Sequence, residues 1–238
     1  MRRLAERHGA VQQFSPVLWK AIHEVAQLES RLSRAEQQWV SSMLLAASFK
    51  DDETSQHVQR MSRYTEVLVR TSTDDSQLAR VMRLASQLHD IGKLGIPDDI
   101  VMKRGPLTDE EVEVMRGHTL IGHDILQDVE SEVAELAASI ALGHHERWDG
   151  GGYPHGLSGH DIPLAARIAA IADTFDALTT DRVSKKALSL PNALHMMRAE
   201  KGRQFDPDLL DSFLGAIDHV MDIFNKYPDE VIPSRPTA

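Results

Sequence analysis

The stretch Gln87–Asp99, QLHDIGKLGIPDD, is the part of the sequence from which the fold and the chemistry are best approached. It sets the pair His89-Asp90 at the end of an apolar pattern, and Gly92 and Gly95 behind the pair permit a tight turn. Imidazole and carboxylate suit Zn, Fe and Mn as ligands, so the pair is a candidate metal site. A helix over 76–89 is predicted by apolar residues three and four apart, namely Leu78, Val81, Leu84, Ala85 and Leu88.

Helical spacing continues outward from this stretch. Segments 53–71, 131–146 and 163–179 carry apolar residues at helical rather than strand intervals. Thr108 and Glu111 form a capping box that predicts a helix running to about Leu126. Asp206-Pro207 is typical of a helix start and predicts a helix over 207–225. The sequence therefore predicts an all-α fold with little or no sheet.

Residues 14–50 form a long polar helix pattern with one apolar seam. The seam fits either packing on the following domain or pairing in a parallel homodimer. We expect an N-terminal connector helix over 1–49, one main domain over 50–225 and a flexible tail over 226–238, which is rich in proline. The seam consists of Ala21, Val25, Leu28, Leu32, Ala35 and Trp39.

Composition excludes several classes of protein. The net charge is −10 with no long basic run, which argues against a partner of duplex nucleic acid. The chain has no cysteine, so disulfides, thiolate metal sites and cysteine nucleophiles are excluded. The N-terminus lacks the apolar core of a signal peptide, and no apolar run is long enough to span a membrane. These features predict a cytoplasmic protein.

Further histidines and acids extend the candidate metal site. Glu53 and His57 stand four apart, which places both on one helix face, although such a pair is more often a surface feature. His118 taken singly is more often a core or surface histidine. A second His–Asp pair, His123-Asp124, is interpreted as a decoy.

Burial strengthens the remaining candidates. His144 and His145 end an apolar helix pattern, where protonated imidazoles would be costly to bury and neutral metal-bound ones would not. Asp173 falls inside an otherwise apolar helix pattern, so its carboxylate needs a charged partner or a metal. Several such signals together make a shared metal site more probable than any one of them does alone. The predicted ligands are Glu53, His57, His89, Asp90, His118, His144, His145 and Asp173.

These residues suit a metal-dependent hydrolase. A carboxylate such as Asp90 can bridge two cations about 3.5–4 Å apart, and these can activate one hydroxide between them. Lys93, three residues further along, is set to stabilise charge on an anionic group. A donor set of nitrogen and oxygen alone favours Fe(II), Mn(II) or Ni(II) over calcium.

Four strings carry a family resemblance. HHERWDGGGYPHGLSGHDIP over 144–163 and HDIGKLGIP resemble the HD-GYP branch of the HD-domain phosphohydrolases. ETSQH over 53–57 and IADTFDALTTDR over 171–182 also match, in the family's order and at its spacings. The resemblance covers roughly residues 50–220, and the GYP tripeptide is Gly152-Tyr153-Pro154.

The resemblance implies a function. Members are bacterial all-α phosphodiesterases that open cyclic di-GMP to pGpG and, in many cases, to GMP. It implies an HD-type helical bundle in which all eight residues above hold two or three divalent ions, with Asp90 as the bridge and Glu53 marking a third ion. It further implies that Lys93 assists at the scissile phosphate. Tyr153, Arg182 and Lys185 resemble substrate contacts, and the GYP loop also resembles a docking site for partner proteins.

Two departures and two alternatives remain at this point. The family usually reads DRPYKKA where this chain has Val183 and Ser184, and it often has a histidine at the position of Gln204. Both changes bear on loop shape and not on a ligand. One alternative is an HD hydrolase of another nucleotide or cyclic dinucleotide, against which the long GYP string argues. The other is a module that senses cyclic di-GMP or docks a partner with little turnover, against which the intact ligand set argues.

Overall fold

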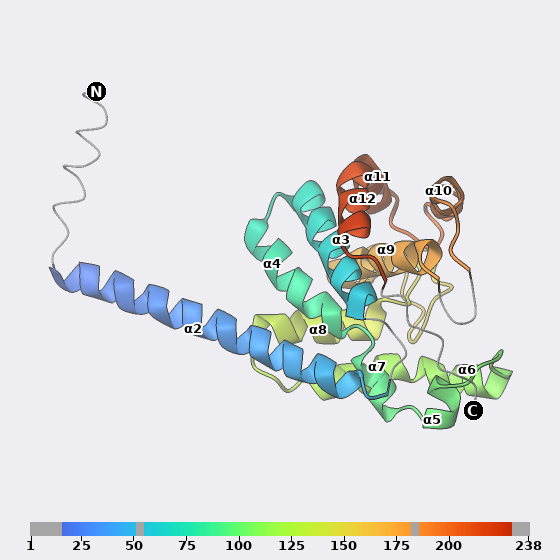
Figure 1. Ribbon diagram of the computed structural model, residues 1–238, viewed down its shortest axis with the longest axis horizontal. Helices are drawn as coiled ribbons and strands as arrows, with labels where there is room; N and C mark the ends of the chain where they lie inside the picture. The colour runs from blue at the N-terminus through green and yellow to red at the C-terminus, as the bar shows by residue number, and fades with distance from the viewer. Residues whose placement is uncertain (1–15, 51–54, 182–185, 230–238) are drawn as a thin grey trace. The chain divides into compact units, whose positions relative to one another are not determined.

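The computed structural model describes residues 16–50, 55–181 and 186–229 (Figure 1). The chain divides into two compact units, Met1–Trp39 and Val40–Ala238. The helices are α2 (Pro16–Ala47), α3 (Ser55–Thr73), α4 (Ser76–Ala85), η1 (Ser86–Leu88), η2 (Ile91–Gly95), α5 (Asp98–Val101), α6 (Asp109–Arg116), α7 (His118–Leu126), α8 (Glu132–Gly143), η3 (Gly159–Asp161), α9 (Leu164–Thr179), α10 (Leu190–Ala199), α11 (Pro207–Gly215) and α12 (Ile217–Lys226).

The prediction of an all-α fold is confirmed. Within 16–50, 55–181 and 186–229 the chain forms no β-strand, and β-pairing is limited to two isolated bridges. In the second unit α3 packs against α4, α9, α11 and α12, while α8 packs against α4, α7 and α9 (Figure 1). This arrangement brings α3, α7, α8 and α9 together around one region of the bundle.

An aromatic cluster joins three helices of the core. Tyr64 of α3, Phe175 of α9 and Phe213 of α11 are fully buried. Their ring centroids lie 5.3–6.5 Å apart in edge-to-face arrangements, which aromatic rings prefer to direct stacking. The cluster fixes α3 against α9, the two helices that carry His57 and Asp173.

Small residues let α8 and α9 approach closely at the centre of the bundle. Most of α9 is buried, and both helices are rich in alanine. A Cβ added at Gly143, the last residue of α8, would lie 2.9 Å from Cβ of Ala166 on α9. The glycine therefore sets how near the end of α8, with its two histidines, comes to α9.

Several predicted helices are interrupted. The capping box of Thr108 and Glu111 is present, but the helix ends at Arg116, and a new one begins at His118 after Gly117. The helix predicted over 76–89 is α-helical only to Ala85 and continues as a 3₁₀ turn. Asp206 caps the helix that follows it, as predicted, but that helix is divided into α11 and α12.

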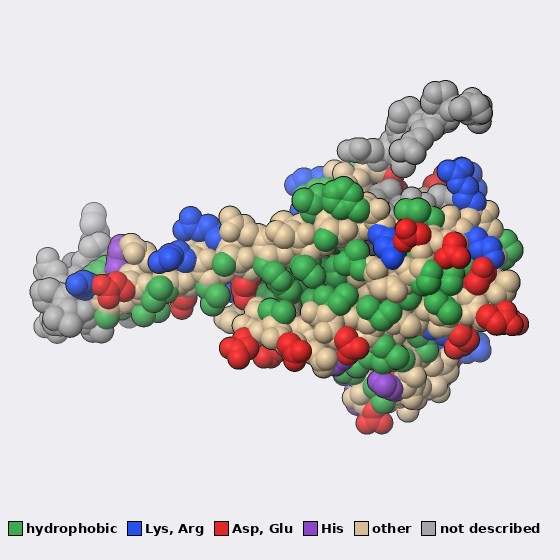
Figure 2. All heavy atoms as spheres, turned by 90° about the horizontal axis from the view of Figure 1, so that it is seen from below, with side chains coloured by type: hydrophobic (Ala, Val, Ile, Leu, Met, Phe, Trp, Pro, Cys, Tyr) green, Lys and Arg blue, Asp and Glu red, His purple; other side chains and the backbone are tan. Residues whose placement is uncertain are grey.

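Helix α2 displays its apolar residues to solvent. Trp19, Ile22, Val25, Leu28 and Leu32 are each about half exposed or more, from 48 to 63%. Figure 2 shows apolar side chains along the helix beside charged ones. None of the described helices combines the length and the apolar character needed to cross a bilayer.

Candidate metal centre

Seven of the eight predicted ligands gather into two groups that could each hold a metal ion. One group is Asp90, His118, His144 and His145, and the other is His57, His89 and Asp173. Within each group one ligand atom per residue lies within 4.8 Å of the others. The eighth predicted ligand, Glu53, lies outside the described residues.

Helix ends supply most of these side chains. His89 and Asp90 lie between η1 and η2, His118 begins α7, and His144 and His145 follow the last residue of α8. Backbone at a helix end is free to turn, so several helices can direct side chains to one point. The other two lie within helices, His57 in the first turn of α3 and Asp173 in the middle of α9.

Four of the histidines share one hydrogen-bonding pattern. In each, Nδ1 faces an oxygen that can only accept, so Nδ1 carries the proton and Nε2 keeps its lone pair. Metal-binding histidines in proteins are oriented in this way. The acceptors are Oδ2 of Asp176 for His57 (2.8 Å), and the carbonyls of Ser86 for His89 (3.1 Å), Met115 for His118 (2.7 Å) and Ile140 for His144 (2.9 Å).

The donor set fits divalent cations. Nε2 of His118 and Nε2 of His144 are buried and make no hydrogen bond with any described residue, and the same holds for Oδ1 of Asp90. The two nitrogens lie 3.1 and 3.5 Å from that oxygen. Buried polar atoms without hydrogen bonds are costly, and a cation that binds nitrogen and oxygen removes the cost.

Asp90 faces both groups at once. Its Oδ1 lies near His118 and His144 of its own group, while its Oδ2 lies 3.3 Å from Nε2 of His89 in the other. Lys93 places Nζ 2.8 Å from the same Oδ2. Burial by itself raises the pKa of the Asp90 carboxyl, but the Lys93 ammonium and the surrounding imidazoles hold that pKa well below its usual range. The residue is thus an anion placed between the two groups.

The imidazole of His145 is kept neutral. Burial, with the adjacent His144 as the next cause, lowers its pKa far below the ordinary value for histidine. A neutral ring is the form that binds a cation. The Tyr153 ring of the GYP loop stacks on it, with centroids 4.8 Å apart and an angle of 24°.

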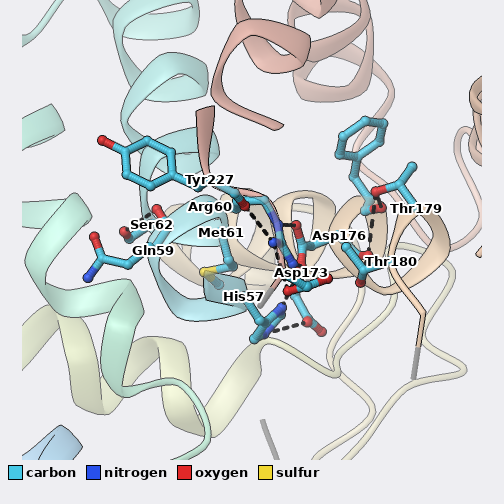
Figure 3. Close-up of polar contacts among 12 residues, drawn as sticks. His57, Gln59, Arg60, Met61, Ser62, Asp173, Asp176, Thr179, Thr180 and Tyr227 are labelled. Atoms are coloured by element: carbon cyan, nitrogen blue, oxygen red, sulfur yellow. Dashed lines mark hydrogen bonds and ion pairs between the residues drawn. The ribbon is translucent and has the colours of Figure 1, made fainter. Parts of the chain in front are cut away.

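The second group is joined by side chains from α3 and α9. Nε2 of His57 lies 3.7 Å from Oδ1 of Asp173, and the rings of His57 and His89 are 5.6 Å apart. Figure 3 shows contacts from His57 to Asp173 and to Asp176, and from Arg60 to Asp176. Asp176 and Arg60 were not predicted. A signal for them exists, because each stands three residues after a predicted ligand on the same helix.

Glu146 anchors the GYP loop next to the ligands. Its side chain is 3% exposed and accepts hydrogen bonds from the backbone N–H groups of His155 (2.8 Å) and Leu157 (3.0 Å). The guanidinium of Arg116 lies 5.0 Å from the centroid of the Tyr153 ring, a cation–π distance. Sequence reasoning missed both Glu146 and Arg116, because neither stands at ligand spacing.

The second His–Asp pair takes no part in the two groups. His123 lies on α7 with Nδ1 3.4 Å from the carbonyl of Ala138, and neither His123 nor Asp124 joins a group, which agrees with the interpretation of that pair as a decoy. Two predicted substrate contacts, Arg182 and Lys185, lie outside the described residues.

A pocket adjoins Asp90. Its lining includes apolar side chains, which can pack against the face of a planar ring. It also includes the side-chain amides of Gln59 and Gln87, which can offer hydrogen-bond donors and acceptors to the edge of such a ring. The lining residues are Leu44, Ala47, Ser48, Ser55, Val58, Gln59, Gln87, Asp90 and Ile91.

Comparison with known proteins places this geometry in a family. A family model described as HD domain matches residues 40–209. A probable cyclic di-GMP phosphodiesterase of Vibrio cholerae is 38% identical over 221 residues, which cover 87% of this chain and 50% of that protein. The 3′3′-cGAMP-specific phosphodiesterase 2 of the same organism is 37% identical over 198 residues, which cover 83% and 38%.

A solved structure agrees with the fold. The cyclic GMP-AMP specific phosphodiesterase of Vibrio cholerae superposes with a TM-score of 0.57 at 16% identity, over 81% of this chain and 54% of that one. This chain spans about half the length of the curated relatives it matches first. Because the HD-domain model covers most of the chain, the chain belongs to the HD-domain family.

Proposed function

We propose that this protein is a metal-dependent phosphodiesterase that hydrolyses cyclic di-GMP to pGpG, and the assay below shows whether hydrolysis goes on to GMP. The observation that carries the proposal is the carboxylate of Asp90, which faces two metal-capable groups with Lys93 at its side. The relatives named for cyclic di-GMP hydrolysis support it. All eight predicted ligands, Glu53 included, belong to this proposal.

Each side chain has a defined task in it. When bound, divalent ions supply Lewis-acid charge and a nucleophile at neutral pH. Asp90 holds both ion positions, and the Lys93 ammonium stabilises negative charge that develops on the phosphate. Tyr153 covers His145 and offers its ring to a guanine, while Arg182 and Lys185 hold phosphate or base. The donors, all nitrogen and oxygen, favour Fe(II), Mn(II) or Ni(II).

Turnover of purified, metal-analysed protein tests the function. Cyclic di-GMP and 3′3′-cGAMP are incubated separately, and pGpG, GMP and the mixed products are followed by chromatography. We expect cyclic di-GMP to be consumed, with no turnover after chelation and recovery on adding Mn(II). Faster loss of 3′3′-cGAMP would transfer the assignment to that substrate, which the name of one relative favours. Tight binding of either nucleotide without product would indicate a sensing module.

The matched control for this assay is His123→Ala. His123 belongs to the other His–Asp pair and to neither metal-capable group. We expect this variant to hydrolyse cyclic di-GMP like the unchanged protein, because the removed imidazole contacts no candidate ligand. Loss of metal and turnover in this variant would show that the site is assigned to the wrong pair.

We further propose that residues 1–49 connect an input to the catalytic domain over 50–225, and that α2 pairs with α2 of a second copy. The exposed seam residues Val25, Leu28 and Leu32 support this, since heptad seams bury themselves in pairs. A Leu28→Lys, Leu32→Lys double variant should then lower the mass measured by light scattering by about half. Gln27→Lys is the control, because it adds a charge away from the seam.

An unchanged mass in the double variant would contradict the dimer. The apolar seam would then be assigned to packing on the main domain. Docking of a partner protein at the GYP loop and a cytoplasmic location stay predictions from the sequence.

A further inference from the structure

A buried ion pair lies one helical turn from the second metal-capable group. Arg60 of α3 is 1% exposed and Asp176 of α9 is 0% exposed. Their side chains form a two-pronged contact, Nε to Oδ1 at 2.7 Å and Nη2 to Oδ2 at 2.9 Å (Figure 3). This planar, two-pronged contact fixes both the distance and the angle between the Arg60 guanidinium and the Asp176 carboxylate.

The pair repeats the spacing of two candidate ligands. His57 and Arg60 stand three apart on α3, and Asp173 and Asp176 stand three apart on α9, so each couple shares a helix face. His57 and Asp173 approach each other at 3.7 Å. The ion pair therefore joins α3 to α9 one turn away from the point where the two ligands meet.

Asp176 also holds one ligand directly. Its Oδ2 accepts a hydrogen bond from Nδ1 of His57 at 2.8 Å as well as one from Arg60. Burial raises the pKa of the Asp176 carboxyl, but the hydrogen bonds from Arg60 and His57 outweigh burial and lower that pKa below its ordinary value. An ionised carboxylate can only accept, which leaves the Nε2 lone pair of His57 for the metal side.

The last described residues of the chain reach the same arginine. Nη1 of Arg60 donates to the carbonyl of Tyr227 at 2.8 Å and to Oδ1 of Asp229 at 2.9 Å. The guanidinium thus has acceptors on two sides, Asp176 toward the metal group and the segment Tyr227–Asp229 away from it. The segment Tyr227–Asp229 is thus connected through one side chain to the support of a candidate ligand.

We propose that Asp176 and Arg60 are positioning residues for the ion held by His57, His89 and Asp173, and that Tyr227–Asp229 completes their support. The proposal rests on the metal site of the proposed function. It assigns Asp176 the task of orienting His57, and it assigns Arg60 the task of holding Asp176. Neither residue touches the substrate.

Asp176→Asn tests the proposal with little change of shape. Asparagine keeps only one accepting oxygen and loses the negative charge, so it cannot accept all three hydrogen bonds that Asp176 accepts from Arg60 and His57. Metal-free protein is titrated with Mn(II), and free Mn(II) is read by electron paramagnetic resonance. We expect affinity for one ion to fall about 10- to 100-fold, as for other outer-shell partners of metal ligands, while ions held by the Asp90 group bind as before.

Asp206→Asn is the matched control. Asp206 is also a buried carboxylate paired with an arginine, Arg167, but it contacts none of the candidate ligands. Its variant should bind Mn(II) like the unchanged protein. Asp229→Ala, at a carboxylate that is 31% exposed, should weaken the same single ion by a few-fold. Equal Mn(II) binding by Asp176→Asn and the unchanged protein would overturn the proposal.

The tautomer of His57 is a second readout, which a merely structural role would not move. Nitrogen-15 NMR of the metal-free, unchanged protein should find the proton on Nδ1, and Asp176→Asn should disturb that state. A proton on Nε2 in the unchanged protein would overturn the proposal even if Asp176→Asn did not fold. If the unchanged protein bound no Mn(II), the proposed function would fail, whereas the tautomer would still report on the orienting of His57.

Discussion

Asp90→Ala is expected to abolish hydrolysis of cyclic di-GMP and to deplete the protein of bound metal. The variant removes the one carboxylate that faces His118 and His144 through Oδ1 and His89 through Oδ2. Both ion positions lose an anionic ligand together, so turnover should fall on the order of 10³-fold or more. The measurement pairs product chromatography with metal analysis of the same sample.

Asp124→Ala is the matched control for this substitution. Asp124 also follows a histidine, but it is exposed and belongs to neither metal-capable group. Circular dichroism of both variants should match that of the unchanged protein, because the helices do not depend on the Asp90 carboxylate. Unchanged hydrolysis in Asp90→Ala would contradict the proposed mechanism.

Gly92→Ala is expected to damage the site through the backbone. A Cβ there would lie 1.9 Å from the carbonyl oxygen of His118 and 2.4 Å from the backbone N of Gly122, so η2 and α7 must separate. Overpacking of this kind costs about 3 kcal/mol, which lowers the melting temperature by roughly 6–12 °C in a domain of this size. His118, the first residue of α7, should move with its helix, so metal content should fall as well.

Gly105→Ala separates this effect from the general cost of adding a methyl group. A Cβ at Gly105 meets no atom within 4 Å, and its backbone lies outside the left-handed region. Its melting temperature and metal content should equal those of the unchanged protein. If Gly92→Ala behaved in the same way, the close contact between η2 and α7 would be contradicted.

Local pattern predicted the helical fold and singled out seven residues that the structure gathers into two metal-capable groups. Apolar periodicity predicted the buried stripe of α3, where Met61, Tyr64 and Leu68 are fully buried, and capping chemistry predicted the starts at Thr108 and Asp206. The ligands were predicted because histidines and acids inside apolar patterns need a partner. The pattern was wrong at Gly117 and after Ala85, where the predicted helices end early. These breaks change the direction of the backbone, so that His118 and His89 lie at the candidate site.

The supporting contacts depend on packing that no local pattern contains. Arg60 and Asp176 are 116 residues apart and meet only because α3 packs on α9. Without that contact a buried arginine in an apolar stripe and a second aspartate after Asp173 look like ordinary polar positions. The same holds for Arg116 at the end of α6, whose ring partner Tyr153 comes from the GYP loop.

The anchor of the GYP loop also limits how that loop can change over time. The Glu146 carboxylate accepts hydrogen bonds from the main-chain N–H groups of His155 and Leu157 and not from their side chains. These two positions can therefore exchange almost any side chain for another and keep the loop's course. Proline is the exception, because it has no N–H to donate. In homologous loops, the side chains at positions 155 and 157 should vary freely, but proline should be absent from both positions.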